Sequence, residues 1–224
     1  MCIRDRVNVH GFITVSGEKM SKSRGTGISP LRYLEIGMNA EWMRYYIAAK
    51  LNARVEDMDF NPEDFIARVN SDLVGKYVNI ASRAASFITK HFDGALGYSG
   101  DTAALSAEYA QQAESIRAAF EAREYNRAIR EIMAYADGIN QAFDTAQPWV
   151  LAKGIATADD AQKAALQDIC SRSLAGFKAL SVMLAPVLPS LAERVALELF
   201  GAQAPFTWAC LLYTSDAADE GLGV

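Results

Sequence analysis

The spacing of hydrophobic residues predicts a chain made mostly of amphipathic helices. Beyond residue 60, apolar side chains recur at steps of three and four positions, as they do along one face of an α-helix. We predict five helices, over about residues 61–92, 106–122, 125–143, 161–185 and 191–200. Because short polar turns join them, the pattern predicts a mainly α fold built as an antiparallel helical bundle.

The first of these helices has the clearest boundaries and two distinct faces. Asn61 suits the N-cap, and Pro62 suits the first turn, where no backbone N–H is needed. The residues predicted to face the core are Phe65, Val69, Leu73, Tyr77, Ile80, Ala84 and Phe87. A polar stripe lies opposite, formed by Asp72, Lys76, Asn79, Arg83, Ser86 and Lys90. Asp93 and Gly94 are expected to end the helix.

The first sixty residues follow a different pattern, which divides the chain into two parts. Residues 7–15 are predicted to form a strand, 16–30 a loop with several glycines, and 31–36 and 41–52 short helices. We therefore expect residues 7–60 to be the end of one domain and residues 61–209 to be the bundle.

The two ends of the chain set no helical or strand period. Residues 1–6 and 210–224 resemble translated sequencing adapter, so we expect both to be foreign and the natural protein to extend further. Genuine termini that lack a fixed structure are the alternative.

Composition narrows the class of protein. The chain has 224 residues, 51% hydrophobic, with a net charge of −5, which argues against a disordered chain and against a nucleic-acid binder whose whole surface is basic, while a basic stripe on one face is still allowed. No apolar run is long enough to cross a membrane, and no secretory signal is present. Cys2, Cys170 and Cys210 form no metal or disulfide pattern, and Cys170 is expected to be a buried apolar residue. We expect a cytoplasmic protein that contacts neither membrane nor DNA.

A cationic loop follows the predicted strand. Lys19-Met20-Ser21-Lys22-Ser23 lies in a stretch flanked by glycines, and mobile cationic loops of this kind suit a polyphosphate. The spacing of a Walker loop is absent. For an arbitrary cluster of lysine and serine, a solvated surface loop is the ordinary interpretation.

The order of these five residues resembles the signature loop of class I aminoacyl-tRNA synthetases. The resemblance implies that Lys19, Met20, Ser21, Lys22 and Ser23 close over ATP, with Mg²⁺ as the counter-ion of the nucleotide. It also implies that Lys22 stabilises the departing pyrophosphate, that Lys19 is the more structural lysine, and that Ser21 and Ser23 supply local hydrogen bonds.

Four further stretches are similar to the methionyl-tRNA synthetase family. They are residues 31–51, 69–73, 79–83 and the run Gln147-Pro148-Trp149-Val150-Leu151-Ala152-Lys153. The resemblance covers about residues 7–208. It implies that the bundle is the anticodon-binding domain of class I synthetases, preceded by the end of a Rossmann-type catalytic domain. The parent would be a methionine–tRNA ligase that activates methionine with ATP and transfers it to tRNA(Met).

Four residues are candidates for contact with the anticodon stem-loop of tRNA(Met). Asn79 and Arg83 are one helical turn apart and can address the same base, while Trp149, stiffened by Pro148, offers a surface for stacking. The resemblance implies that all four read the anticodon. The ordinary alternatives are a solvated helix face for Asn79 and Arg83, and a core or capping residue for Trp149.

Parts of a complete synthetase are absent from this sequence. It has no His-x-Gly-His-type element, no methionine pocket and no zinc-bearing insertion, so methionine and ATP would be bound with an N-terminal half. We expect this fragment alone to be inactive and to bind no zinc. Two alternatives are a stand-alone tRNA-binding helical module without catalysis, and a class I synthetase for another large aliphatic amino acid. Pro148-Trp149 together with Asn79 and Arg83 disfavours the latter.

Overall fold

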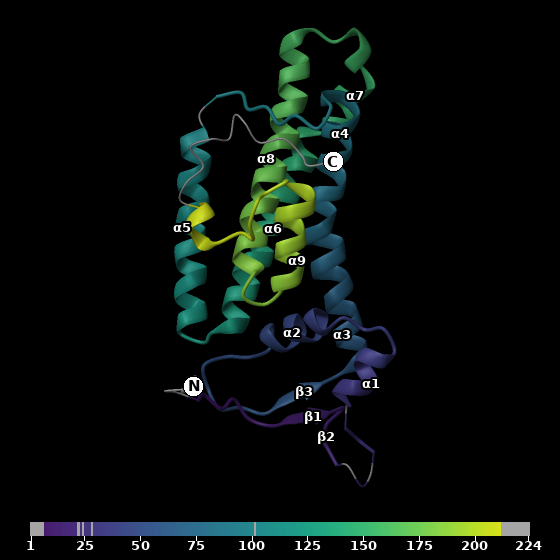
Figure 1. The fold of residues 1–224 in the computed structure, drawn as a ribbon, viewed down its shortest axis with the longest axis vertical. Helices are drawn as coiled ribbons and strands as arrows, with labels where there is room; N and C mark the ends of the chain where they lie inside the picture. The colour runs from purple at the N-terminus through teal and green to yellow at the C-terminus, as the bar shows by residue number, and fades with distance from the viewer. Residues whose placement is uncertain (1–6, 22, 24, 28, 101, 212–224) are drawn as a thin grey trace.

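A computed structural model describes residues 7–211 of the chain, apart from residues 22, 24, 28 and 101. A bundle of long helices occupies most of the molecule, and a small sheet lies at one end of its long axis (Figure 1). The mainly α fold predicted from the sequence is therefore confirmed. The segments 1–6 and 212–224, both expected to be foreign, lie outside the described residues.

The base of the molecule is a three-stranded sheet with two short helices. These elements are β1 (Ile13–Val15), β2 (Glu18–Lys19), α1 (Pro30–Glu35), α2 (Ala40–Ala48) and β3 (Met58–Phe60). The strand order is β2-β1-β3, with β1 antiparallel to β2 and parallel to β3. The strand predicted over residues 7–15 is only three residues long. Strands β2, within the predicted loop 16–30, and β3 were not predicted, because they are too short to show a period.

The bundle contains long helices joined by shorter helical segments. Its elements are α3 (Pro62–Arg68), the π-helix η1 (Val69–Val78), α4 (Asn79–Phe92), α5 (Thr102–Glu121), α6 (Tyr125–Ala146), α7 (Pro148–Lys153), η2 (Ile155–Thr157), α8 (Asp160–Leu184), α9 (Pro189–Arg194), η3 (Val195–Leu199) and η4 (Trp208–Leu211). Helices α4, α5, α6 and α8 run alternately up and down the bundle, so α4 and α6 point the same way (Figure 1).

The helix predicted over residues 61–92 is continuous but not α-helical throughout. Asn61 accepts hydrogen bonds from the backbone N–H groups of Glu63 and Asp64, at 2.8 and 3.2 Å, which confirms the predicted cap. Ten residues in the middle form the π-helix η1. The buried residues there follow one another at steps of four, a spacing that the wider π turn keeps on one face. Asp93, with φ of 50°, ends α4 in the left-handed region.

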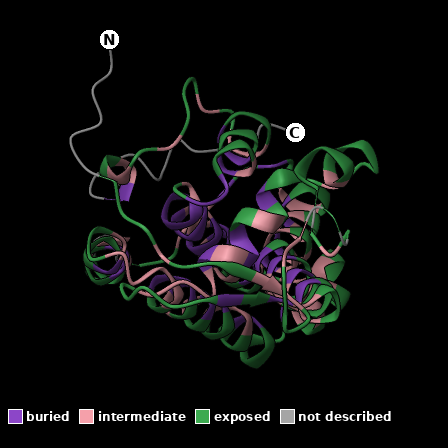
Figure 2. Cartoon of the chain, turned by 90° about the horizontal axis from the view of Figure 1, so that it is seen from below, coloured by how far each residue is buried: buried purple, intermediate pink, exposed green. Residues whose placement is uncertain are grey.

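Helix α8 lies at the centre of the core. Figure 2 shows buried segments in the interior and exposed ones around them. Cys170, on α8, is fully buried and is not in a disulfide, and burial raises the pKa of its thiol to about 12. It is thus the neutral apolar residue that was expected. On α4, Phe87 is only half-buried and its neighbour Ile88 is fully buried instead, a shift that follows the π-helix.

Polar contacts hold the base against the bundle. The buried carboxylate of Glu41 on α2 accepts hydrogen bonds from the backbone N–H groups of Ser190 and Leu191, in the first turn of α9. Arg44 donates to the carbonyls of Pro186 and Val187, both at 3.0 Å. Leu211, in the C-terminal segment expected to be foreign, is 3% exposed and packs in the core.

The cap at Asn61 gives a testable stability prediction. Asn61→Ala leaves two backbone donors of α3 without their acceptor, so we expect the free energy of unfolding to fall by about 1 kcal/mol. Urea unfolding followed by circular dichroism measures the change. The matched control is Asn70→Ala, because Asn70 is an exposed residue within the same long helix. An equal loss in both variants would show that the cap contributes nothing specific.

Candidate signature loop and RNA interface

The turn between β1 and β2 is held by a single carboxylate. Asp59, on β3, accepts hydrogen bonds at one oxygen from the Thr14 hydroxyl at 2.6 Å and from the Gly17 backbone N–H at 2.7 Å. Ser16 and Gly17 both have positive φ, of 51° and 79°, as tight hairpin turns require. The two hydrogen bonds lower the pKa of the Asp59 carboxyl. The hairpin that leads into the signature loop therefore has a fixed start.

Thr26 is hydrogen-bonded to Ser21 of the signature loop. The Thr26 hydroxyl accepts from the Ser21 backbone N–H at 3.0 Å, and the Thr26 N–H donates to the Ser21 carbonyl at 3.3 Å. The hydroxyls of Ser21 and Ser23 are 3.1 Å apart. Thr26 was not among the predicted site residues, because a threonine outside the five-residue motif gives no sequence signal.

The remaining loop residues differ in exposure. Lys19 is exposed, and its Nζ lies 5.5 Å from the centre of the Phe12 ring. Met20 is half-buried and lines an apolar cavity of about 400 Å³ between the sheet and the helices α1 and α2. Lys22, the residue predicted to stabilise pyrophosphate, lies outside the described residues.

At the other end of the molecule, Arg83 packs on two aromatic rings. Its guanidinium carbon lies 4.7 Å from the centre of the Phe143 ring and 5.8 Å from that of Trp149. The guanidinium also forms an ion pair with Asp144. Pro148 is buried at the start of α7, directly before Trp149. The structure thus brings together three of the four predicted anticodon residues.

Asn79, the fourth predicted anticodon residue, lies one turn before Arg83, as the first residue of α4. Its side chain is half-buried, and no described residue forms a hydrogen bond with its amide group. The amide is therefore available to an external partner that also reaches Arg83.

Phe143 and Asp144 belong to this cluster, although sequence reasoning did not assign them to a site. Phe143 was placed on the apolar face of its helix, and nothing local distinguishes Asp144 from other surface acids. They meet Arg83 because α4 and α6 run parallel. The same register pairs Lys76 with Asp137 at 2.7 Å, two turns earlier.

The polar stripe predicted on the first long helix is only partly a free surface. Asp72 is half-buried and accepts a hydrogen bond from the Tyr45 hydroxyl at 2.9 Å, so its role is structural. Lys76 is held by Asp137. Ser86 and Lys90 are exposed, as predicted.

Within residues 7–211, apart from the four undescribed positions, no group of three or more histidine, cysteine, aspartate or glutamate side chains is arranged to hold a metal ion. No helix in the described part of the chain has the length and apolarity to span a membrane.

The Asp59 contacts predict a pH-dependent hairpin. The pKa of this carboxyl lies below its ordinary value, so its contribution to the hairpin is fully present above about pH 4 and is lost as pH falls through the lower, folded value. We expect the Gly17 amide resonance to titrate in this acidic range by NMR. Asp59→Asn should shift that resonance at neutral pH and abolish its titration. Asp57→Asn is the control, because Asp57 binds the Phe12 N–H instead. A Gly17 resonance that is the same in Asp59→Asn would contradict the assignment.

Comparison with known proteins places this geometry in a family. Residues 1–85 match the family model of class I tRNA synthetases (M). The methionine–tRNA ligase of Methylibium petroleiphilum is 61% identical over 198 residues, which are 85% of this chain and 27% of that protein. That of Janthinobacterium sp. (strain Marseille) is 58% identical over 210 residues, covering 93% of this chain and 29% of that protein.

A solved structure shows the same fold. Mycobacterium tuberculosis methionyl-tRNA synthetase in complex with methionyl-adenylate matches with a TM-score of 0.81 at 27% identity, over 95% of this chain and 41% of that one. These findings agree with the predicted family and with the predicted status of the sequence as a fragment. The chain belongs to the methionyl-tRNA synthetase family of class I and spans less than a third of the length of these curated relatives.

Proposed function

We propose that this chain is the part of a methionine–tRNA ligase that supplies the pyrophosphate-stabilising loop and the anticodon-reading bundle. The parent protein activates methionine with ATP and transfers it to tRNA(Met) in the cytoplasm. The observation that carries the proposal is the cluster at the far end of the bundle, where Arg83 lies over Phe143 and Trp149. The relatives named above support the reaction.

The signature loop has the properties that polyphosphate chemistry needs. Lys19 is exposed at the end of a fixed hairpin, and Lys22 follows three residues later. Cations held near the phosphates of ATP, with Mg²⁺ as counter-ion, stabilise the charge that develops as pyrophosphate departs. In this proposal Lys22 contacts the leaving group, while Lys19, Met20, Ser21 and Ser23 shape the loop around it.

The bundle has the properties that recognition of an unpaired base needs. Single-stranded loops of RNA are bound by stacking their bases on aromatic side chains or guanidinium groups and by hydrogen bonds to the base edges. Trp149 offers the ring, Arg83 the guanidinium and Asn79 an amide with both a donor and an acceptor. Pro148 fixes the backbone before Trp149 because it begins α7 and is buried.

The placement of the two sites fits one long RNA. The signature loop extends from the sheet at one end of the molecule, and α7 lies at the opposite end (Figure 1). A tRNA contacts its synthetase at its acceptor end, where methionine is attached, and at its anticodon. We therefore propose residues 7–60 as the end of the catalytic domain and residues 61–209 as the anticodon-binding domain.

The role of Trp149 is tested with a 17-nucleotide anticodon stem-loop. We expect the chain to prefer the CAU loop over one with a changed first anticodon base. Trp149→Ala should weaken CAU binding by the free energy of stacking one base, about 1–3 kcal/mol, and remove the preference for CAU. Fluorescence anisotropy at one fixed salt concentration measures the affinity for each loop.

The control for this measurement is Trp42→Ala, because Trp42 is 37% exposed on α2, at the base of the molecule. Equal weak binding of both loops, unchanged in Trp149→Ala, would contradict the proposed site.

Asp144 gives a second prediction at the same site. Its carboxylate neutralises Arg83 and repels phosphates, so Asp144→Asn frees a cation and removes a negative charge. We expect affinity for both stem-loops to rise, with a steeper dependence on salt concentration. The control is Glu121→Gln, which removes a negative charge at the end of α5. A rise of the same size in both variants would indicate a general charge effect and not the release of Arg83.

A further inference from the structure

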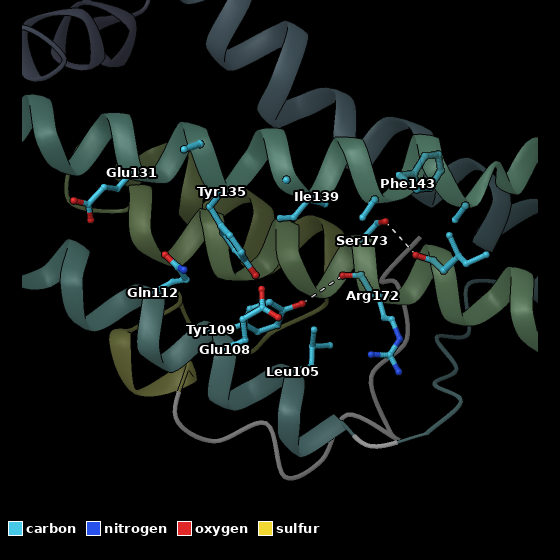
Figure 3. A pocket seen from close by; sticks show the side chains of 15 residues that line it. Leu105, Glu108, Tyr109, Gln112, Glu131, Tyr135, Ile139, Phe143, Arg172 and Ser173 are labelled. Carbon is cyan, nitrogen blue, oxygen red and sulfur yellow. Dashed lines mark hydrogen bonds between the residues drawn. The ribbon is translucent and has the colours of Figure 1, made fainter.

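A groove of about 700 Å³ lies between α5, α6 and α8 (Figure 3). The groove and α4 lie on different sides of α6. Tyr135 and Gly138 of α6 line the groove, whereas Asp137 and Asp144 of the same helix pair with η1 and α4. Apolar side chains from all three helices line it, including Leu105, Ile139 and Ile169. The groove shares Phe143 with the proposed RNA site, but none of the four predicted anticodon residues lines it.

The charges around the groove leave one carboxylate without a counter-ion. Three charged residues line it. The Arg172 guanidinium is bound by Asp168 at 2.8 Å, and Figure 3 shows it directed away from the groove. Glu131 is paired with Arg127 at 2.8 Å. Glu108 is exposed and forms no ion pair with any cation of the described residues, so one carboxylate of the groove's lining has water but no cation as its counterpart.

Two tyrosines surround this carboxylate. Tyr109 on α5 and Tyr135 on α6 pack edge to face, with ring centres 6.1 Å apart. Figure 3 shows the side chains of Glu108, Tyr109 and Tyr135 directed toward one another in the middle of the groove. Burial raises the pKa of both tyrosines, so their hydroxyls stay protonated and neutral. The Tyr109 hydroxyl is left with a long hydrogen bond of 3.5 Å to the Arg172 carbonyl.

We propose that this groove binds a small organic ammonium ion, a primary amine carrying a short apolar body. Its N–H groups would donate to the Glu108 carboxylate and to the tyrosine hydroxyls, and its charge would add the cation that Glu108, hydrogen-bonded to the Tyr135 hydroxyl, does not have. Aromatic faces attract such a cation further. The apolar body packs against Leu105, Ile139 and Ile169. The ammonium end of the ligand then lies beside the polar residues of the groove and the apolar end beside its aliphatic residues.

The experiment uses the 224-residue chain and phenethylammonium as the probe, titrated by calorimetry and by NMR at pH 7. We expect saturable binding, with amide shifts around residues 105–112 and 134–142. The neutral analogue 2-phenylethanol has the same apolar body without the charge, and its affinity should be lower by a factor of about ten or more. Glu108→Gln should lose about tenfold in affinity for the ammonium, and the surface control Glu114→Gln should lose none.

A second variant blocks the groove without disturbing the fold. Gly138 lines it, and a Cβ there would meet no atom within 4 Å, so Gly138→Leu fills open space and also favours the helix. This variant should abolish binding of the probe while unfolding no more easily than the parent chain. Absence of saturable binding, equal affinity for the alcohol, equal affinity in Glu108→Gln, or shifts confined to the Arg83 face would each overturn the proposal.

Discussion

Packing of α6 against α8 is the constraint on which both proposed sites of the bundle depend. A Cβ at Gly176 on α8 would lie 2.6 Å from Cδ1 of Ile139, so the glycine lets α8 pack directly against the Ile139 side chain of α6. One side of α6 then presents Asp137 and Asp144 to the helix that contains Arg83, and another side forms the wall of the groove. Phe143 belongs to both, since it lines the groove and lies under Arg83.

In the proposed function, the pairing of charges along α6 would let an acidic chain bind RNA selectively. Its net charge is −5, and Lys76 and Arg83 on the proposed anticodon face are each neutralised by an aspartate at rest. Such a face has little long-range attraction for phosphates, so a duplex that offers only its backbone gains little from it. An unpaired loop gains stacking on Trp149 and can displace Asp144 from Arg83 at short range. Affinity then depends on a base being available to stack.

The sequence was sufficient for features that depend on local periodicity and insufficient for those created by packing. The long helices, the Asn61 cap and the buried Cys170 follow from spacing and residue type, and the structure confirms them. Strands of two or three residues carry no period, and the π-helix changes which residues of α4 face the core. Asp72 was placed on a solvated stripe, yet it is bound by Tyr45, and Asp144 is distinguished only by its contact with Arg83. Each of these needs a partner far away in the sequence.

Lys50 connects the sheet at the base of the molecule to the first helix of the bundle. Its ammonium group donates to the Asp59 carbonyl at 3.1 Å and pairs with Asp64, in the first turn of α3, at 2.8 Å. The side chain of the same Asp59 fixes the turn between β1 and β2. The hairpin is therefore tied to the first helix of the bundle by one lysine and one aspartate. If the signature loop closes over a polyphosphate as proposed, these contacts would keep the hairpin before it in register with the bundle.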